Sequence, residues 1–163
     1  MMPMTAVQIA SLVLVLLACV PDVRTRRIPN ALTFGAAATA LLFHGATGGW
    51  GGLLSSLGGW ALGAALFFPI FALRGMGAGD VKLLAAVGAW LGPSDVFKVA
   101  LITAIAGGVL ALLVAFMHGY VTTAFRNLVG LLTYWRVVGP RPHPQVTLEA
   151  SKGPRLAYAI PIA

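Results

Sequence analysis

An all-α membrane helix bundle is the fold class that the sequence predicts, and three observations support it. Only 9% of the 163 residues are charged and 59% are hydrophobic, whereas about 25% of the residues in an average soluble domain are charged. The hydrophobic residues form five long runs, each ended by charges, Gly or Pro. No polar block between them is large enough to fold separately. We therefore predict a single integral-membrane domain over residues 1–163, polytopic, with five to six transmembrane helices.

The first five helices are predicted from the apolar runs themselves. These runs lie at about residues 4–20, 31–46, 50–73, 81–92 and 96–120. A membrane-spanning helix needs about 20 residues, so the second and fourth runs are short, and we expect the fourth to extend beyond its visible ends or to lie partly recessed. The first run is followed, not preceded, by Arg24, Arg26 and Arg27. A cleaved signal peptide has the opposite order, so this run is predicted to be a retained helix.

The C-terminal third of the chain is predicted to be less regular. Residues 121–153 have apolar residues at near-helical spacing and then a Pro-rich stretch, "PRPHPQ". They predict an interfacial amphipathic helix followed by a cytoplasmic loop. The final segment, "GPRLAYAIPIA", begins like another helix but stops too soon to span a bilayer. The last transmembrane helix is therefore predicted to be abbreviated.

Several glycines fall four residues apart within the apolar runs, as Gly59 with Gly63 and Gly88 with Gly92. Small residues at this spacing allow helix backbones to approach closely in lipid. A chain with 20 glycines also produces such pairs by chance. The sequence leaves both interpretations open.

The net charge of +7 predicts an orientation in the membrane. The 11 Lys and Arg residues are scattered between apolar runs, and not clustered into the basic face that binds nucleic acid, so no nucleic-acid partner is predicted. Ten of them fall on one predicted side of the membrane, and Lys98 alone falls on the other. By the positive-inside rule, the N-terminus lies outside and the loops with Asp22 and Asp80 are cytoplasmic. The basic loops are expected to face anionic lipid.

The chain has only four acidic residues, so each can be interpreted in turn. Asp95 follows a Pro at the start of a predicted helix and is expected to cap it and to pair with Lys98. Glu149 lies in the polar loop, where it is expected to be solvated. Asp22 and Asp80 each border an apolar run on the same predicted side. Taken singly, each is equally well explained as an acid at a helix terminus.

Taken together, Asp22 and Asp80 allow a specific chemistry. Two carboxylates within hydrogen-bond distance cannot both ionise easily, so the pair holds one proton near neutral pH. The ionised member can take a proton from water while the protonated member polarises a peptide carbonyl. The pair therefore predicts hydrolysis through an activated water, without a metal or organic cofactor.

The glycines before Asp80 fit this hypothesis. Without a Cβ, Gly75, Gly77 and Gly79 permit unusual dihedral angles and the close approach of another backbone, so a substrate strand is expected to lie there. A phosphate-binding loop would need Lys followed by Ser or Thr after its last glycine. This sequence has Asp80 instead.

Two segments, "PDVRTRRIPN" and "GMGAGDVKLLAAVGAWLG", closely resemble the two signature segments of type IV prepilin peptidases, which are polytopic aspartic proteases with a G-x-G-D motif. The similarity in layout covers about residues 5–160. The resemblance implies that Asp22 and Asp80 are the catalytic residues. It also implies six further motif residues, expected near the substrate: Gly77, Gly79, Lys82, Ile28, Pro29 and Asn30. The role of Lys82 is left open.

This resemblance implies a membrane aspartic endopeptidase of the bacterial inner membrane. It would cleave the basic leader peptide of a prepilin or pseudopilin at the cytoplasmic face, after a glycine and before the hydrophobic helix. The longer members also carry an N-terminal extension with paired cysteines and methylate the new N-terminus. Without that extension the sequence resembles the short form associated with tight-adherence (Flp-type) pili, so methyl transfer is not predicted. The sequence does not reveal the oligomeric state.

A small membrane transporter or assembly subunit is the alternative from a different functional class. In it, Asp22 and Asp80 would relay protons or bind a cation, because ionisable groups at a membrane are costly and usually functional. Transporters often contain internally repeated halves, and no such repeat is found in this sequence. Asp80→Glu discriminates between the two hypotheses. It keeps the negative charge but moves the carboxylate, which should abolish proteolysis, whereas a proton relay can tolerate the change in position.

Three other kinds of site have less support in the sequence. Presenilin-type proteases share the G-x-G-D motif, but they pair it with Tyr-Asp and Pro-Ala-Leu segments that this sequence lacks. A serine-type enzyme would need Ser55 or Ser56 beside His118. A metal site would need His44, His118 and His143, which are dispersed in sequence, to be gathered by folding.

Overall fold

The protein folds into a helical bundle, for which a computed structural model describes residues 5–25, 27–119 and 121–139; within these ranges it contains no strand. The helices are α1 (Ala6–Thr25), α2 (Asn30–Ala72), α3 (Ala78–Leu91), α4 (Pro93–Met117) and α5 (Val121–Val138). Three of the described helices, α1, α2 and α4, are long and apolar enough to cross a membrane. The predicted all-α membrane bundle is confirmed. The predicted abbreviated last helix and the Pro-rich loop lie outside the described residues.

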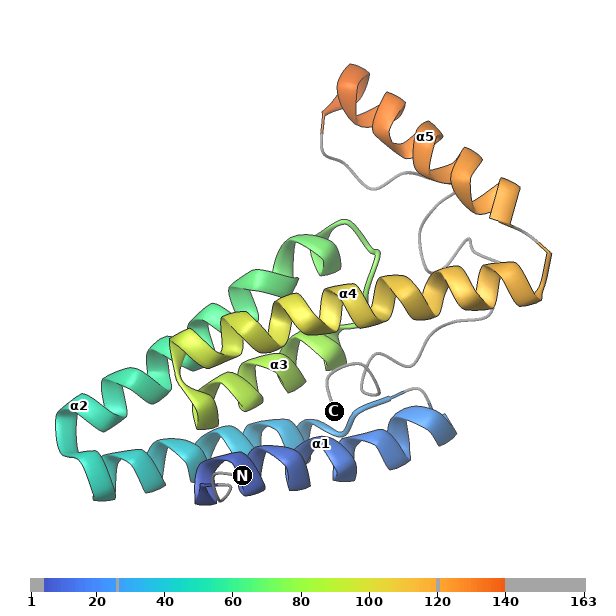
Figure 1. Cartoon of the computed structure of the whole chain (residues 1–163). Coiled ribbons are helices and arrows are strands. Elements are labelled where there is room, and N and C mark those ends of the chain that lie inside the picture. The colour runs from blue at the N-terminus through green and yellow to red at the C-terminus, as the bar shows by residue number, and fades with distance from the viewer. Residues whose placement is uncertain (1–4, 26, 120, 140–163) are drawn as a thin grey trace.

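Helix α2 contains the second and third predicted helices, joined by a sharp bend. Its 43 residues would measure about 65 Å if straight, roughly twice the thickness of the bilayer core. Instead the chain turns back at Gly49 (φ 55°, ψ −143°), a conformation that glycine adopts far more readily than other residues. A Cβ on Gly52 would lie only 2.2 Å from the carbonyl oxygen of His44. The two arms, 30–48 and 50–72, therefore form a V (Figure 1).

Helix α3 lies at the centre of the bundle. Nine of its 14 residues are buried, and α1, α2 and α4 all pack against it. At about 21 Å it is too short to cross the roughly 30 Å core of a bilayer. It begins at Ala78, three residues before the predicted start, so the predicted extension is confirmed at this end. Its depth in the membrane stays a prediction.

Helices α2 and α3 meet backbone to backbone through glycines. A Cβ on Gly59 would lie 2.0 Å from the carbonyl oxygen of Gly88, and a Cβ on Gly88 would lie 2.2 Å from that of Gly59. A Cβ on Gly63 would lie 2.6 Å from the carbonyl oxygen of Leu84. Of the two interpretations that the sequence leaves open, the structure favours close helix approach, and the glycines at the contact are required by lack of space.

The C-terminal end of α3 is held by side chains from both arms of α2. The last carbonyl groups of a helix lack partners within the helix, and in hydrocarbon each must be satisfied internally. Ser56 Oγ donates a hydrogen bond of 2.7 Å to the carbonyl of Ala89, and His44 Nε2 donates one of 2.9 Å to that of Trp90. The bend in α2 thus brings both arms to the same end of α3.

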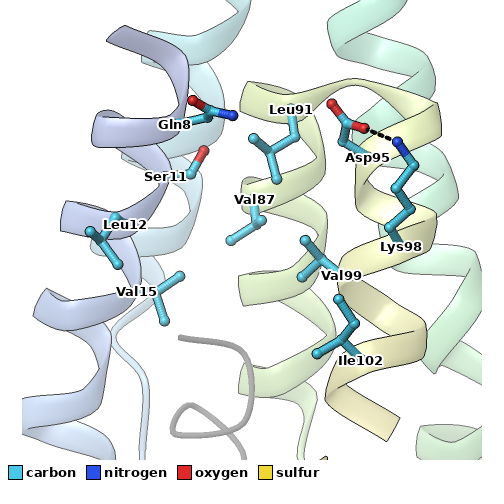
Figure 2. A pocket seen from close by; sticks show the side chains of 10 residues that line it. All are labelled: Gln8, Ser11, Leu12, Val15, Val87, Leu91, Asp95, Lys98, Val99 and Ile102. Atoms are coloured by element: carbon cyan, nitrogen blue, oxygen red, sulfur yellow. Dashed lines mark hydrogen bonds and ion pairs between the residues drawn. The ribbon is translucent and has the colours of Figure 1, made fainter. Parts of the chain in front are cut away.

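The connectivity gives the bundle two different ends (Figure 1). One end holds the last turn of α1, the first turn of α2 and the first turn of α3. The opposite end holds the start of α1, the bend of α2 and the turn from α3 into α4, together with a groove of about 370 Å³ (Figure 2). The groove residues come from α1, α3 and α4: Gln8, Ser11, Leu12, Val15, Val87, Leu91, Asp95, Lys98, Val99 and Ile102.

Asp95 lies at this opposite end, where one prediction is confirmed and another is wrong. Its carboxylate pairs with Lys98 Nζ at 2.8 Å, as predicted. The predicted capping role is wrong, because the N-cap of α4 is Gly92 and no side chain caps it. Asp95 lies in the first turn, where the helix dipole favours a negative charge.

Helix α5 is the amphipathic helix predicted at the start of residues 121–153. It runs from Val121 to Val138 and carries two charged residues, Arg126 and Arg136. Among the described elements it contacts only α4. Its position at a membrane interface stays a prediction.

Candidate active site

Asp22 lies at the end of the buried face of α1. Ser11, Val15, Ala18 and Asp22 are all buried, and their spacing of three or four residues places them on one side of the helix. Helix α1 packs mainly against α3. The periodicity of α1 therefore directs a carboxylate that is only 6% exposed into the bundle.

A tight turn after α2 leads the chain to the second carboxylate. Arg74 adopts a left-handed conformation (φ 57°), and its amide donates to the carbonyl of Phe71 at 2.8 Å. The amide of Gly75 donates to the carbonyl of Ile70 at 2.9 Å. This pair of bonds is a Schellman motif, which ends a helix and reverses the chain. Met76, 5% exposed, then anchors the turn in the core.

Asp80 is the third residue of α3 and its carboxylate turns back on the helix start. It accepts a hydrogen bond from the amide of Gly77, the N-cap residue, as the acidic residue of a capping box does. A Cβ on Gly77 would lie 3.2 Å from Asp80 Oδ2, so a side chain there would displace the carboxylate. Asp80 is 9% exposed.

The predicted reason for the motif glycines is only partly right. Gly77 has an ordinary extended backbone (φ −76°, ψ 149°), and in this turn the positive φ belongs to Arg74. The prediction of unusual dihedral angles at Gly75, Gly77 and Gly79 is therefore wrong. What Gly77 and Gly79 provide is space: a Cβ on Gly79 would lie 3.3 Å from Cβ of Ile28. The neighbour of Gly79 is thus a side chain, and not the backbone that we expected.

The two carboxylates interact electrostatically. Asp80 lies in α3, outside the three candidate spans. Burial, and after it the negative charge of Asp22, raise the pKa of Asp80 from 3.8 to about 6, against the lowering effect of the Gly77 amide. Both effects disfavour the ionised form. The fold therefore brings two acids that are far apart in sequence to one buried place at one end of the bundle.

The remaining motif residues lie beside this pair. Ile28 is buried, Pro29 is the N-cap of α2, and Asn30 is its first residue. Lys82 Nζ donates a hydrogen bond of 2.9 Å to Asn30 Oδ1. The same ammonium lies 5.4 Å from the centroid of the Phe34 ring, a cation–π distance.

Sequence reasoning missed two neighbours of this site, Phe34 and Met76. Phe34 lies four residues after Asn30, on the same face of α2, so the helical period could have placed it near Lys82 once Asn30 was assigned. Met76 lies inside the glycine-rich turn, where no helical or strand periodicity of hydrophobic residues could predict its burial. Its burial depends on tertiary packing.

The structure argues against the serine-type alternative. Ser55 and Ser56 lie near the C-terminal end of α3, where Ser56 Oγ is bound to the carbonyl of Ala89 and a Cβ on Gly92 would lie 3.1 Å from Ser55 Oγ. His118 follows the other end of α4, which is about 38 Å long. These serines and this histidine cannot form a catalytic pair.

The described residues also contain no group of three His, Cys, Asp or Glu side chains that could hold a metal ion. His44 and His118 lie at opposite ends of the bundle. His143 lies outside the described residues.

The sequence was compared with known proteins and solved structures. The sequence profile of the type IV leader peptidase family matches residues 9–112, which is more than half of the chain. The chain belongs to the type IV leader peptidase family. Both Asp22 and Asp80 lie within the matched residues, as do all six other predicted motif residues. No solved structure matches the chain significantly.

Named bacterial proteins are similar to this chain over part of their length. A protein of Burkholderia pseudomallei named prepilin leader peptidase/N-methyltransferase is 35% identical over 102 residues, which cover 56% of this chain and 31% of that protein. A protein of the same name from Xanthomonas campestris is 33% identical over 109 residues, covering 60% of this chain and 36% of that protein. The chain thus matches about a third of the length of these relatives.

Proposed function

We propose that the chain is a membrane aspartic endopeptidase that cleaves the leader peptide of a type IV prepilin or pseudopilin, with Asp22 and Asp80 as its catalytic pair. The observation that carries this proposal is the juxtaposition of two buried carboxylates in which the charge of one raises the pKa of the other. Membership of the type IV leader peptidase family supports it. The single domain over residues 1–163 is the peptidase unit of this proposal.

The pair supplies both a base and an acid. Asp80 keeps its proton more readily than an ordinary Asp, so it is the better donor towards the peptide carbonyl oxygen. The carboxylate of Asp22 then accepts a proton from water as the water oxygen bonds to the carbonyl carbon. Collapse of the tetrahedral intermediate breaks the C–N bond. The departing amine takes up the proton that Asp22 accepted from water, and a hydroxyl group of the intermediate returns a proton to Asp80 as the new carboxyl group forms.

The cytoplasmic side of the membrane is the proposed place of cleavage. The end of the bundle that holds the two acids also carries Arg24, Arg27, Arg74 and Lys82. At the opposite end Lys98 is neutralised by its ion pair. This asymmetry supports an N-terminus outside and a catalytic end inside. The cations of this end and of α5 would face anionic lipid.

An Flp-type prepilin is the proposed substrate within this class. The names of the two relatives combine leader peptidase with N-methyltransferase, and of these we carry over only the peptidase, because paired carboxylates supply hydrolysis. The resemblance of the sequence as a whole to the short, tight-adherence form supports the Flp-type substrate. Methyl transfer is not part of the proposal.

Mass measurement of the products tests this function. We expect the purified full-length chain in lipid nanodiscs to cut an Flp-type prepilin once, after a glycine at the end of its basic leader, and to leave the new N-terminus unmethylated when S-adenosylmethionine is added. A longer-leader prepilin of the kind made with bifunctional peptidases serves as the comparison. No cleavage of either precursor would contradict the peptidase proposal. Cleavage of the comparison precursor alone would contradict only the Flp-type assignment.

A further inference from the structure

The first turn of α3 contacts two different helices through residues that are two positions apart. Residues at i and i+2 of an α-helix point about 200° apart, so Asp80 and Lys82 face nearly opposite directions. Asp80 is coupled to Asp22 of α1, whereas Lys82 reaches Asn30 on α2. This turn therefore links the helix that carries one acid to the helix that follows it in the chain.

Lys82 makes both of its described contacts with the first five residues of α2. Its ammonium donates to Asn30 Oδ1 at 2.9 Å and lies over the ring of Phe34. In the same turn of α3, Gly79 leaves space for the side chain of Ile28. A polar contact at Asn30 and an apolar contact at Ile28 thus both hold the start of α2 on α3.

The position of α1 relative to α2 depends mainly on helix α3. The two helices share little contact and α1 rests mainly on α3. Asp22 lies eight positions before Asn30 in the sequence, so movement of the start of α2 is transmitted to the end of α1 through a short connection. The contact between Lys82 and Asn30 limits that movement.

Lys82 does not act on Asp80 as a counter-ion in this geometry. The causes that shift the pKa of Asp80 are burial, the charge of Asp22 and the amide of Gly77. The ammonium is directed towards α2, where it binds an amide oxygen and an aromatic face. Its position favours a mechanical role over an electrostatic one.

We propose that Lys82 is a positioning residue that fastens the start of α2 to the first turn of α3 and thereby holds Asp22 and Asp80 together. This inference rests on the proposed peptidase function. It assigns a role to the cation that the sequence motif leaves unexplained.

Lys82→Met tests the proposal, because it keeps an unbranched apolar side chain of nearly the same length and removes the ammonium. We expect kcat to fall by about ten- to a hundredfold, since small misplacements of catalytic groups carry losses of this size, while the pH profile keeps its wild-type midpoints. Lys82→Arg, which retains a donor and a cation, should keep most of the activity. Asn30→Leu should reproduce the Lys82→Met loss, and the double variant should lose no more than either single variant.

Lys98→Met is the matched control, because it removes an exposed lysine from the opposite end of the bundle; its activity should stay at the wild-type level. A shifted pH profile in Lys82→Met would overturn the proposal in favour of an electrostatic role. Unchanged kcat, or losses that multiply in the double variant, would also overturn it.

A second measurement does not depend on activity. In a chain with Cys19→Ala, Asp22→Cys and Asp80→Cys, a short bifunctional thiol reagent should join the two introduced cysteines, and adding Lys82→Met should lower the yield several-fold. If the yield of cross-linked product is the same with and without Lys82→Met, the positioning role is overturned. If the cross-link depends on Lys82 while the wild-type chain cleaves no prepilin, the positioning role stands and the proposed function fails.

Discussion

Replacing either Asp22 or Asp80 with Asn is expected to reduce the rate of leader cleavage by about 10³-fold or more. Asn has nearly the shape of Asp but can neither accept a proton from water nor donate one to a carbonyl. Because the two acids act together, losing one removes the function of both. The double variant should therefore be no slower than the single variants. Mass measurement of the cleaved prepilin over time gives the rates.

The same variants should remain folded. Both acids are buried, and exchanging a buried carboxylate for a neutral amide removes a charge that is costly to bury. Asp95→Asn is the matched control, because it removes an exposed acid at the opposite end of the bundle, where an ion pair contributes at most about 1 kcal/mol. It should cleave at the wild-type rate. Substantial cleavage by Asp22→Asn or Asp80→Asn would contradict the catalytic pair.

Asp80→Glu separates a peptidase from a proton relay. The added methylene group would move the carboxyl away from the Gly77 amide that now binds it and away from Asp22. Cleavage should fall nearly as far as in Asp80→Asn, whereas a relay would retain function.

Gly88→Ala is expected to destabilise the bundle by about 3 kcal/mol or more, at the upper end of what overpacking costs. The added Cβ would lie 2.2 Å from the carbonyl oxygen of Gly59 and 3.0 Å from a methyl group of Val96. Because the nearest atom belongs to the backbone, no side-chain rotation relieves the overlap. Helices α2 and α3 would have to separate along the contact that fixes α3, which carries Asp80, in the bundle.

Thermal unfolding in detergent, followed by circular dichroism, measures this effect. Gly108→Ala is the matched control, because a Cβ at Gly108 in α4 meets no atom within 4 Å. The control should unfold at the wild-type temperature or above it, since Ala favours a helix over Gly. Equal stability of Gly88→Ala and Gly108→Ala would contradict the backbone contact between α2 and α3.

Much of the fold follows from hydrophobic periodicity. The run at residues 50–73 and the run at 31–46 both appear as helical arms, and the glycines between them mark the bend. The start of α3 was predicted three residues late because "AGD" is not apolar. That turn is helical because Asp80 bonds to the Gly77 amide, an interaction that hydrophobicity does not detect.

The two acids of the candidate site could be proposed from the sequence, but the contacts that hold the neighbouring residues in place could not. Asp22 and Asp80 stood out because acids are rare in this chain. Both are buried, and their catalytic role stays a prediction. The contact between Lys82 and Asn30 joins residues 52 positions apart, and no local period predicts it. The purpose of Gly77 and Gly79 was partly misjudged for the same reason, since the available space depends on which side chain packs there.

Titration of the aspartate carboxyl groups tests the central claim most directly. The chain contains three aspartates, at 22, 80 and 95, so selective ¹³C labelling of Asp gives three side-chain signals that single substitutions assign. The raised pKa predicts that Asp80 titrates near pH 6, protonated below and ionised above. Asp22→Asn removes the neighbouring negative charge and should lower the pKa of Asp80, while burial keeps it above the ordinary value. An Asp80 pKa that does not change in Asp22→Asn would contradict the claim that these two acids form one catalytic pair.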